Sequence, residues 1–260
     1  MSRRRKGNRY LSSPMYGNCL ILAPDGQALC RTNQDKINWY VERSLGEVVS
    51  DNPTTLRLFF EPSGRRGAEH PYMTAYKANK CAVCGSEDKI TRHHVVPYCF
   101  RKHFPERLKR HRMHDVLPMC VKCHDRYEER ATEMKQKMSD EIGIPLTGLG
   151  VHPAPVGIYS VRSAAHALLH YSDRIPEGRK VELTERLKKH FGKEVITRED
   201  LVVAGNLDRQ TYDPDYKTFG QCVVERIADF RSFIKEWRVH FIQCMKPQFL
   251  PDHWDIDNDL

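Results

Sequence analysis

The sequence lacks long hydrophobic runs, and its longest apolar stretches, such as CLILA at residues 19–23, are only strand-sized. A helix that crosses a bilayer needs about 20 apolar residues, so no membrane span is predicted. The basic start, MSRRRKGNRY, has no apolar core of the kind found in secretory signals, which disfavours export. It fits either a solvated basic arm or the front of a mitochondrial targeting segment. We therefore expect an intracellular protein, with nucleus, cytoplasm and mitochondrion left open.

A disulfide framework is also not expected. The nine cysteines are an odd number, and they are spread over a chain without an export signal. The remaining composition is that of a globular protein, with 260 residues, 40% hydrophobic and 29% charged. The formal charge of +8 suits a polyanionic partner, although charge bears on association rather than on fold.

The pattern along the chain predicts an α+β protein in three segments, residues 1–73, 74–150 and 151–260. In the first, Asp25-Gly26 between two apolar runs predicts a hairpin. Residues 33–46 then predict a helix with Asn33 as N-cap and Gly46 as C-terminal stop, and TTLRLFFEP predicts a strand that ends at Pro62. This segment carries no evident chemistry and is interpreted as a small α/β support layer.

The last segment follows the stretch GIPLTGLGVHPAPVG, whose Gly and Pro residues indicate a boundary, and it is helical in pattern from Ser160 onward. His166 and His170 are four residues apart but lack a third ligand, so they are interpreted as the polar flank of a helix. Trp237, Phe241 and Met245 recur every four residues, which favours packing in a core or against a partner helix.

Two cysteine pairs at two-residue spacing define the middle segment: Cys81 with Cys84, and Cys120 with Cys123. Such a spacing lets a tight turn aim both sulfurs at one ion, and two turns make a tetrahedral site suited to Zn²⁺. The alternative is four buried or free cysteines. A closed four-sulfur site has no open coordination position, so it predicts a structural zinc, and any catalysis must lie beside it.

Histidines stand between and after these pairs, in RHHVVP at residues 92–97 and at His124. The order C-x-x-C, then H-H with two apolar residues and Pro, then C-x-x-C-H resembles the HNH endonucleases of the ββα-metal class. The resemblance implies that His94 is the general base that deprotonates water and that His93 and His124 are ligands of one divalent ion (Mg²⁺, Mn²⁺ or Zn²⁺). Because side chains alternate along a strand, a bend or bulge is expected at the His93-His94 pair.

Two further residues extend this motif. His124 and Glu128 are four apart, so on a helix beginning near Cys123 they share a face, and Glu128 is either a further ligand or an ordinary exposed carboxylate. The position that the HNH family fills with asparagine falls on Asp115. An aspartate accepts the hydrogen bonds that orient the loop but cannot donate them, so this departure bears on catalytic competence rather than on fold.

Six basic residues are candidates for contact with a phosphate backbone. Arg92 precedes the histidine pair and could clamp the scissile phosphate. The others lie in RKHFPERLKRHR, where Phe104 and Leu108 are interleaved with the charges: Arg101, Lys102, Lys109, Arg110 and Arg112. A solvated helix face is the alternative, and no sequence-specific readout is indicated.

Three stretches resemble the C-terminal part of the family of exonuclease 3'-5' domain-containing protein 2: PMYGNCLILAPDGQALC, FRKHFPERLKRHRMHDVLPMC and VHFIQCMKPQFLPDHW. That family joins a DEDD-type exonuclease to a region of this kind. The present sequence contains no Asp-x-Glu triplet. The resemblance therefore does not carry exonuclease activity to these residues.

The expected architecture is a ββα-metal HNH module with a structural zinc, preceded by the small α/β layer and followed by the helical region. The expected activity is metal-dependent hydrolysis of nucleic acid, DNA in preference to RNA, with low sequence specificity. Two other functions fit the same residues. One is a catalytically inactive zinc-dependent nucleic-acid-binding module, and the other is an adaptor that binds a protein partner through its C-terminal helices.

Overall fold

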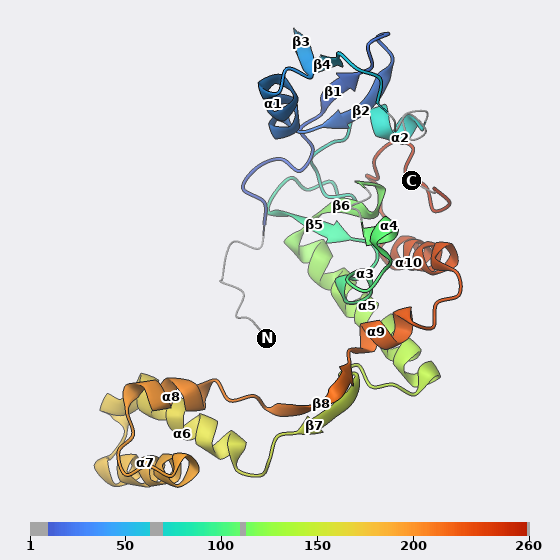
Figure 1. Ribbon diagram of the computed structural model, residues 1–260. Coiled ribbons are helices and arrows are strands. Elements are labelled where there is room, and N and C mark those ends of the chain that lie inside the picture. Colours follow the sequence, from blue (N-terminus) through green and yellow to red (C-terminus); the bar gives the residue numbers. More distant parts are fainter. Residues whose placement is uncertain (1–9, 63–69, 110–112, 259–260) are drawn as a thin grey trace. The chain divides into compact units, whose positions relative to one another are not determined.

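The computed structural model describes residues 10–62, 70–109 and 113–258 (Figure 1). Two compact units divide this part of the chain. Unit 1 contains the described residues up to Gly143 and from Gly220 onward, and unit 2 contains Ile144–Phe219. This boundary comes before residue 150, and residues 220–258 join unit 1; the three-segment division drawn from the sequence stays a prediction. In the described residues, no helix is long and apolar enough to cross a membrane.

Unit 1 begins with a four-stranded sheet in the order β2-β1-β4-β3, beside one helix. Its elements are β1 (Cys19–Leu22), β2 (Ala28–Thr32), α1 (Gln34–Glu42), β3 (Gly46–Asp51) and β4 (Thr54–Leu58). The predicted hairpin is confirmed, because β1 and β2 pair antiparallel and Gly26 between them has φ +86°. Asn33 caps α1 as predicted, its side chain accepting a hydrogen bond from the backbone N–H of Lys36.

Two details of this layer differ from the prediction. The helix α1 ends at Glu42 rather than at Gly46, which instead begins β3, a strand that the sequence pattern did not reveal. Gly46 is required there by close packing, since a Cβ would lie 2.6 Å from the carbonyl oxygen of Arg57 on β4. The strand β4 stops at Leu58, short of Pro62.

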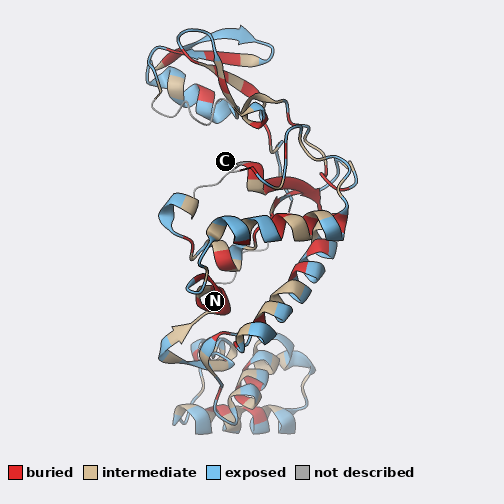
Figure 2. Cartoon of the chain, turned by 90° about the vertical axis from the view of Figure 1, so that its right-hand side faces the viewer, coloured by how far each residue is buried: buried red, intermediate tan, exposed pale blue. Residues whose placement is uncertain are grey.

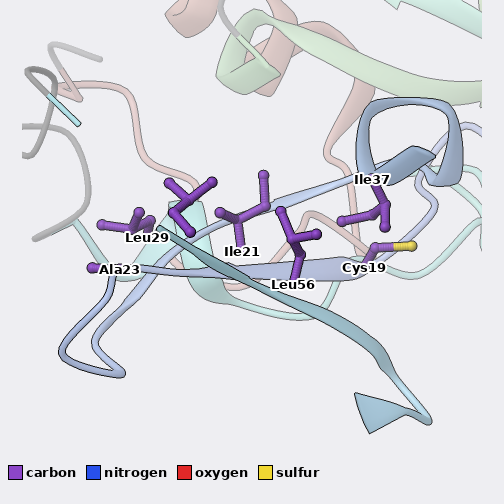
Figure 3. Packing of buried hydrophobic residues seen from close by; sticks show 7 residues of the cluster. Cys19, Ile21, Ala23, Leu29, Ile37 and Leu56 are labelled. Carbon is purple, nitrogen blue, oxygen red and sulfur yellow. The ribbon is translucent and has the colours of Figure 1, made fainter. Parts of the chain in front are cut away.

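One face of this sheet and α1 enclose a small apolar core (Figure 3). Ile21, Leu56 and Ile37 meet in it, and each is at most 5% exposed. Alternation along β1 places Cys19 and Ile21 on the same side of the strand, which explains why every second residue is buried. Cys30 and Tyr40 pack against this core from its edge. The interpretation of the layer as a support for the rest of the chain stays a prediction.

The middle of unit 1 consists of two strands followed by a long helix: β5 (Ile90–His94), β6 (Val116–Cys120) and α5 (Val121–Ile142) (Figure 1). The strands pair antiparallel without a register shift, from Ile90 opposite Cys120 to His94 opposite Val116. All five residues of β6 are buried (Figure 2). The chain enters α5 directly from β6 and leaves it at Gly143, whose φ of 66° is a left-handed C-cap.

Short helices and one long helix complete unit 1: α2 (Pro71–Thr74), α3 (Tyr98–Arg101), α4 (Glu106–Lys109), η2 (Met113–Asp115), α9 (Phe219–Val224) and α10 (Phe230–Met245). The predicted four-residue packing stripe of α10 is confirmed, since Trp237, Phe241 and Met245 are all buried. Through this stripe α10 packs on α5 and reaches the back of β5.

Unit 2 contains a helical core and a two-stranded ribbon. Its elements are β7 (Leu149–Pro153), α6 (Ile158–Tyr171), η3 (Ser172–Arg174), α7 (Glu177–Phe191), α8 (Arg198–Gly205) and β8 (Gln210–Lys217). Ala164 and Ala165 of α6, Leu187 of α7 and Ala204 of α8 are fully buried together. The helices agree with the sequence pattern, and His166 and His170 are exposed on α6 as expected. The ribbon of β7 and β8 was not predicted.

Candidate functional site

The four cysteines of the two pairs converge in unit 1. Their Sγ atoms all lie within 4.8 Å of one another, and Cys84 Sγ is 3.8 Å from Cys120 Sγ. Four sulfurs at about 2.3 Å from one zinc ion lie about 3.8 Å apart, whereas a disulfide bond is about 2.05 Å long. The spacing therefore fits a tetrahedral ion and excludes a disulfide between Cys84 and Cys120.

A tight turn shapes the first pair. The Cys81 N–H donates to the carbonyl of Ser86 at 2.8 Å, and the Gly85 N–H donates to the carbonyl of Cys81 at 2.9 Å. Gly85 has φ +74°, and a Cβ on it would lie 2.8 Å from the ring of Phe249. The Phe249 N–H in turn donates to the carbonyl of Ala82 at 2.9 Å. The segment after α10 thus covers the turn and leaves no room for a side chain at Gly85.

The second pair stands at the start of α5. Cys120 is the N-cap of the helix and Cys123 lies in its first turn. Burial raises the pKa of the Cys120 and Cys123 thiols, while a backbone hydrogen bond at Ser86 lowers that of Cys84. Four thiols this close lose their protons together only beside a cation, so the donor set fits Zn²⁺ and supplies the charge that the ion needs.

A second cluster lies between β5 and α5, where His93, His124 and Glu128 each offer a ligand atom within 4.8 Å of the others. His124 and Glu128 share a face of α5, with Nε2 of the histidine 3.5 Å from Oε1 of the glutamate. His93 comes from β5, and its ring centroid lies 4.9 Å from that of His124. The structure therefore brings together the three residues predicted to hold a catalytic ion.

His93 is the buried member of this cluster. Its ring packs edge-on to Tyr127 and stacks on Phe241 of α10, with centroid distances of 4.8 and 5.7 Å. Neither ring nitrogen has a hydrogen-bond partner, although both are buried. Burial lowers the pKa of His93 well below its usual value, and the nearby His124 and His94 lower it further. A neutral imidazole with orphaned nitrogens is destabilising unless a ligand uses its lone pair.

His94 stands apart from the cluster. The β5–β6 ladder runs through both histidines without a shift, so the bend expected at the pair is not present. In a regular ladder neighbouring side chains lie on opposite faces, which agrees with buried Thr91 and His93 and with exposed Arg92. His94 is half-buried at the last position of β5, on the face that Arg92 shares.

Asp115 is engaged in a buried ion pair rather than lying in the histidine cluster. Arg238 of α10 donates from Nε to Oδ1 at 2.8 Å and from Nη2 to Oδ2 at 3.1 Å. Its third nitrogen donates to the carbonyls of Ile256 and Asn258. Burial opposes ionisation of Asp115, but its contacts with His114 and Arg238 outweigh burial and lower the pKa of the carboxyl. This pair links η2, α10 and the C-terminal segment.

Replacing Arg238 with methionine is expected to destabilise unit 1 by about 3–5 kcal/mol, because the Asp115 carboxylate, whose side chain is only 13% exposed, loses its guanidinium partner. Lys235→Met is the matched control on the same helix: Lys235 pairs with Asp257 in solvent, and its loss should cost less than about 1 kcal/mol. Urea unfolding followed by tryptophan fluorescence measures both. Equal effects of the two variants would contradict a stabilising role for the Asp115–Arg238 pair.

The residues predicted to contact phosphate are in different surroundings. Arg92 and Lys102 are exposed, and Arg101 is half-buried at the end of α3, where burial lowers its pKa. Lys109 pairs with Glu106 on α4 at 2.6 Å. Arg110 and Arg112 lie outside the described residues. Phe104, from the same segment, is buried against Phe230 and Phe233 and is a packing residue.

Several residues around the cluster were missed by sequence reasoning. Thr91 contacts His124, and Tyr127 and Phe241 enclose His93. Thr91 and Tyr127 could have been found from their spacing. Thr91 precedes His93 by two residues on a strand, and Tyr127 follows His124 by three residues on a helix. Arg238 had no local signal, since it is 123 residues from its partner Asp115.

No family model matches the chain, and no solved structure matches it. Among curated proteins, exonuclease 3'-5' domain-containing protein 2 from Mus musculus is 37% identical over 255 residues, covering 95% of this chain and 39% of the relative. The Homo sapiens protein of that name is 36% identical, with 95% and 41% covered. Protein RRP6-like 3 from Arabidopsis thaliana is 36% identical over 211 residues, with 73% and 24% covered.

The chain is thus homologous to exonuclease 3'-5' domain-containing protein 2 over 95% of its own length, and the resemblance predicted from three stretches is confirmed. It spans about two fifths of the length of the first two relatives.

Proposed function

We propose that the chain is a metal-dependent nuclease of the HNH type, in which the cysteine quartet holds a structural zinc and His93, His124 and Glu128 hold the catalytic ion. The observation that carries this proposal is the convergence of these three side chains from β5 and α5, with His93 buried and its ring nitrogens unpartnered. The order β5, β6, α5 supports it, because it is the order of elements that the HNH resemblance implies.

The donor set indicates which ion the cluster would take. Two imidazoles and one carboxylate suit Zn²⁺ and Mn²⁺, whereas Mg²⁺ prefers oxygen ligands throughout. Three protein ligands leave coordination positions for water and a phosphate oxygen. When bound, such an ion stabilises the charge that develops on the phosphate.

The chain's own residues would divide the remaining work. His94, next in sequence to a ligand, is proposed as the base that takes a proton from the attacking water. A regular ladder turns the His94 side chain away from the cluster. The proposal therefore places the attacking water at the end of β5, where the strand stops. Arg92 shares the outer face of β5 with His94 and is exposed, so it can contact the phosphate. Asp115 serves the fold through Arg238.

The relatives favour a second candidate, since two of them are named for a 3'-5' exonuclease domain. A nuclease working from a 3' end needs a free terminus, whereas an endonuclease does not. In the described part of the chain, the groups of three or more His, Cys, Asp or Glu side chains that could hold an ion are the cysteine quartet and the cluster of His93, His124 and Glu128. We therefore place the chemistry in the HNH-like cluster and treat cleavage from an end as the alternative that the experiment separates.

Circular single-stranded DNA tests the proposal directly, because it has no ends. With Mn²⁺ the protein is expected to linearise and then fragment the circle, and EDTA should stop the reaction. Glu128→Gln is expected to lower the rate at least about 10-fold, since it removes a ligand while disturbing little packing: the Glu128 side chain is 51% exposed. A contaminating nuclease would be unaffected by this substitution, so a lower rate in Glu128→Gln also shows that the cleavage comes from this protein.

The other outcomes identify the alternatives. Intact circles together with nucleotide release from a 3'-labelled linear strand would favour an exonuclease. Binding without cleavage, weakening steeply with salt, would favour a nucleic-acid-binding module. A chain that neither cuts nor binds DNA or RNA would favour an adaptor, and each of these three results contradicts the proposal.

A further inference from the structure

We propose that Thr91 is a positioning residue that fixes the tautomer of His124, so that the Nε2 lone pair faces the ion site. The inference rests on the proposed metal site and adds a residue to it. Thr91 is 3% exposed and lies two residues before His93 on the same face of β5. One strand would thus supply one ligand and orient another.

The two hydrogen bonds of Thr91 identify which ring nitrogen of His124 carries the hydrogen. Its Oγ1 lies 2.8 Å from the carbonyl oxygen of Met119 and 2.7 Å from Nδ1 of His124. A threonine hydroxyl has one hydrogen to donate, and a carbonyl oxygen can only accept. The hydroxyl hydrogen therefore goes to Met119. Toward His124 the oxygen acts as acceptor, so the hydrogen on that side belongs to Nδ1 of the histidine.

This assignment leaves Nε2 of a neutral His124 with its lone pair. Nε2 is also the atom that faces Glu128, 3.5 Å from Oε1. Two acceptor atoms that face each other in this way repel unless a cation lies between them. Histidine ligands of metals are commonly held by a hydrogen bond from the other ring nitrogen, which sets the tautomer and the ring orientation. Thr91 supplies that bond here.

Thr91→Val tests the inference, because valine keeps the β-branched shape but cannot accept a hydrogen bond. Mn²⁺ affinity, measured by titration of zinc-loaded protein, is expected to fall about 10- to 100-fold. Thr91→Ser keeps the hydroxyl and should restore most of the affinity. Long-range ¹H–¹⁵N NMR of imidazoles, with His124 assigned by its loss in His124→Gln, should show Nδ1–H in the wild type and Nε2–H in Thr91→Val at pH 8.

The outcomes separate this inference from the proposed function. If Mn²⁺ binding is the same in the wild type and Glu128→Gln, the cluster is not the ion site and the proposed function fails with it. If Glu128→Gln loses Mn²⁺ but Thr91→Val binds as the wild type does, with an unchanged His124 tautomer, only the role of Thr91 is overturned. An Nε2–H or doubly protonated His124 in the wild type at pH 8 also overturns it.

Discussion

Cys84→Ser is expected to lose the bound zinc and to lower the thermal midpoint of unit 1 by more than about 10 °C. Cys84 is the exposed member of the quartet, so its replacement removes a ligand without opening a cavity in the core. Zinc in a four-sulfur site contributes on the order of 10 kcal/mol, which is comparable with the whole stability of a domain. Zinc per chain by mass spectrometry and near-UV circular dichroism on heating measure the two effects.

Cys244→Ser is the matched control, because Cys244 is also an exposed free thiol but lies outside the quartet. It should keep about one zinc per chain and the wild-type midpoint. The two serine variants therefore differ in ligand loss and not in exposure. Full zinc content in Cys84→Ser would show that the quartet does not hold the metal.

The cysteine quartet and the cluster of His93, His124 and Glu128 could be predicted from the sequence because most of their residues are close together along the chain. Cys81 and Cys84 lie in one tight turn, and Cys123, His124 and Glu128 lie within two turns of one helix. Local spacing of this kind fixes which side chains share a face before any tertiary contact forms. The inward position of His93 could be predicted as well, because a strand that is buried on one side places alternate residues inward.

What the sequence could not supply depends on contacts between distant segments. Asp115 pairs with Arg238, and no local sequence pattern indicates this pairing. Phe249, in the segment after α10, covers Gly85, and this contact also joins residues far apart in the sequence. The bend expected at the histidine pair is not present, because continuous pairing with β6 holds β5 straight to its last residue. The missed strand β3 begins at Gly46, where strand pairing overrides the helix-stop signal of that glycine.

His94→Gln is expected to lower DNA cleavage by about 10²- to 10⁴-fold while leaving Mn²⁺ affinity close to that of the wild type. Glutamine is similar in size to histidine and can hydrogen-bond water, but it cannot take up a proton near neutral pH. The adjacent His93→Gln is expected to lower Mn²⁺ affinity at least about 10-fold, because the buried ring that it removes is a ligand of the cluster. Cleavage at saturating Mn²⁺ and Mn²⁺ titration together measure both roles.

Comparison of His94→Gln with His93→Gln is informative because the two histidines are neighbours in sequence but lie on opposite faces of β5. Loss of cleavage through general damage to the strand would affect both variants in the same way, including their unfolding midpoints and zinc content. Wild-type cleavage by His94→Gln would exclude His94 as the base. The Mn²⁺ titrations distinguish this result from a failure of the ion site, since a wrong ligand assignment would leave Mn²⁺ affinity unchanged in His93→Gln as well.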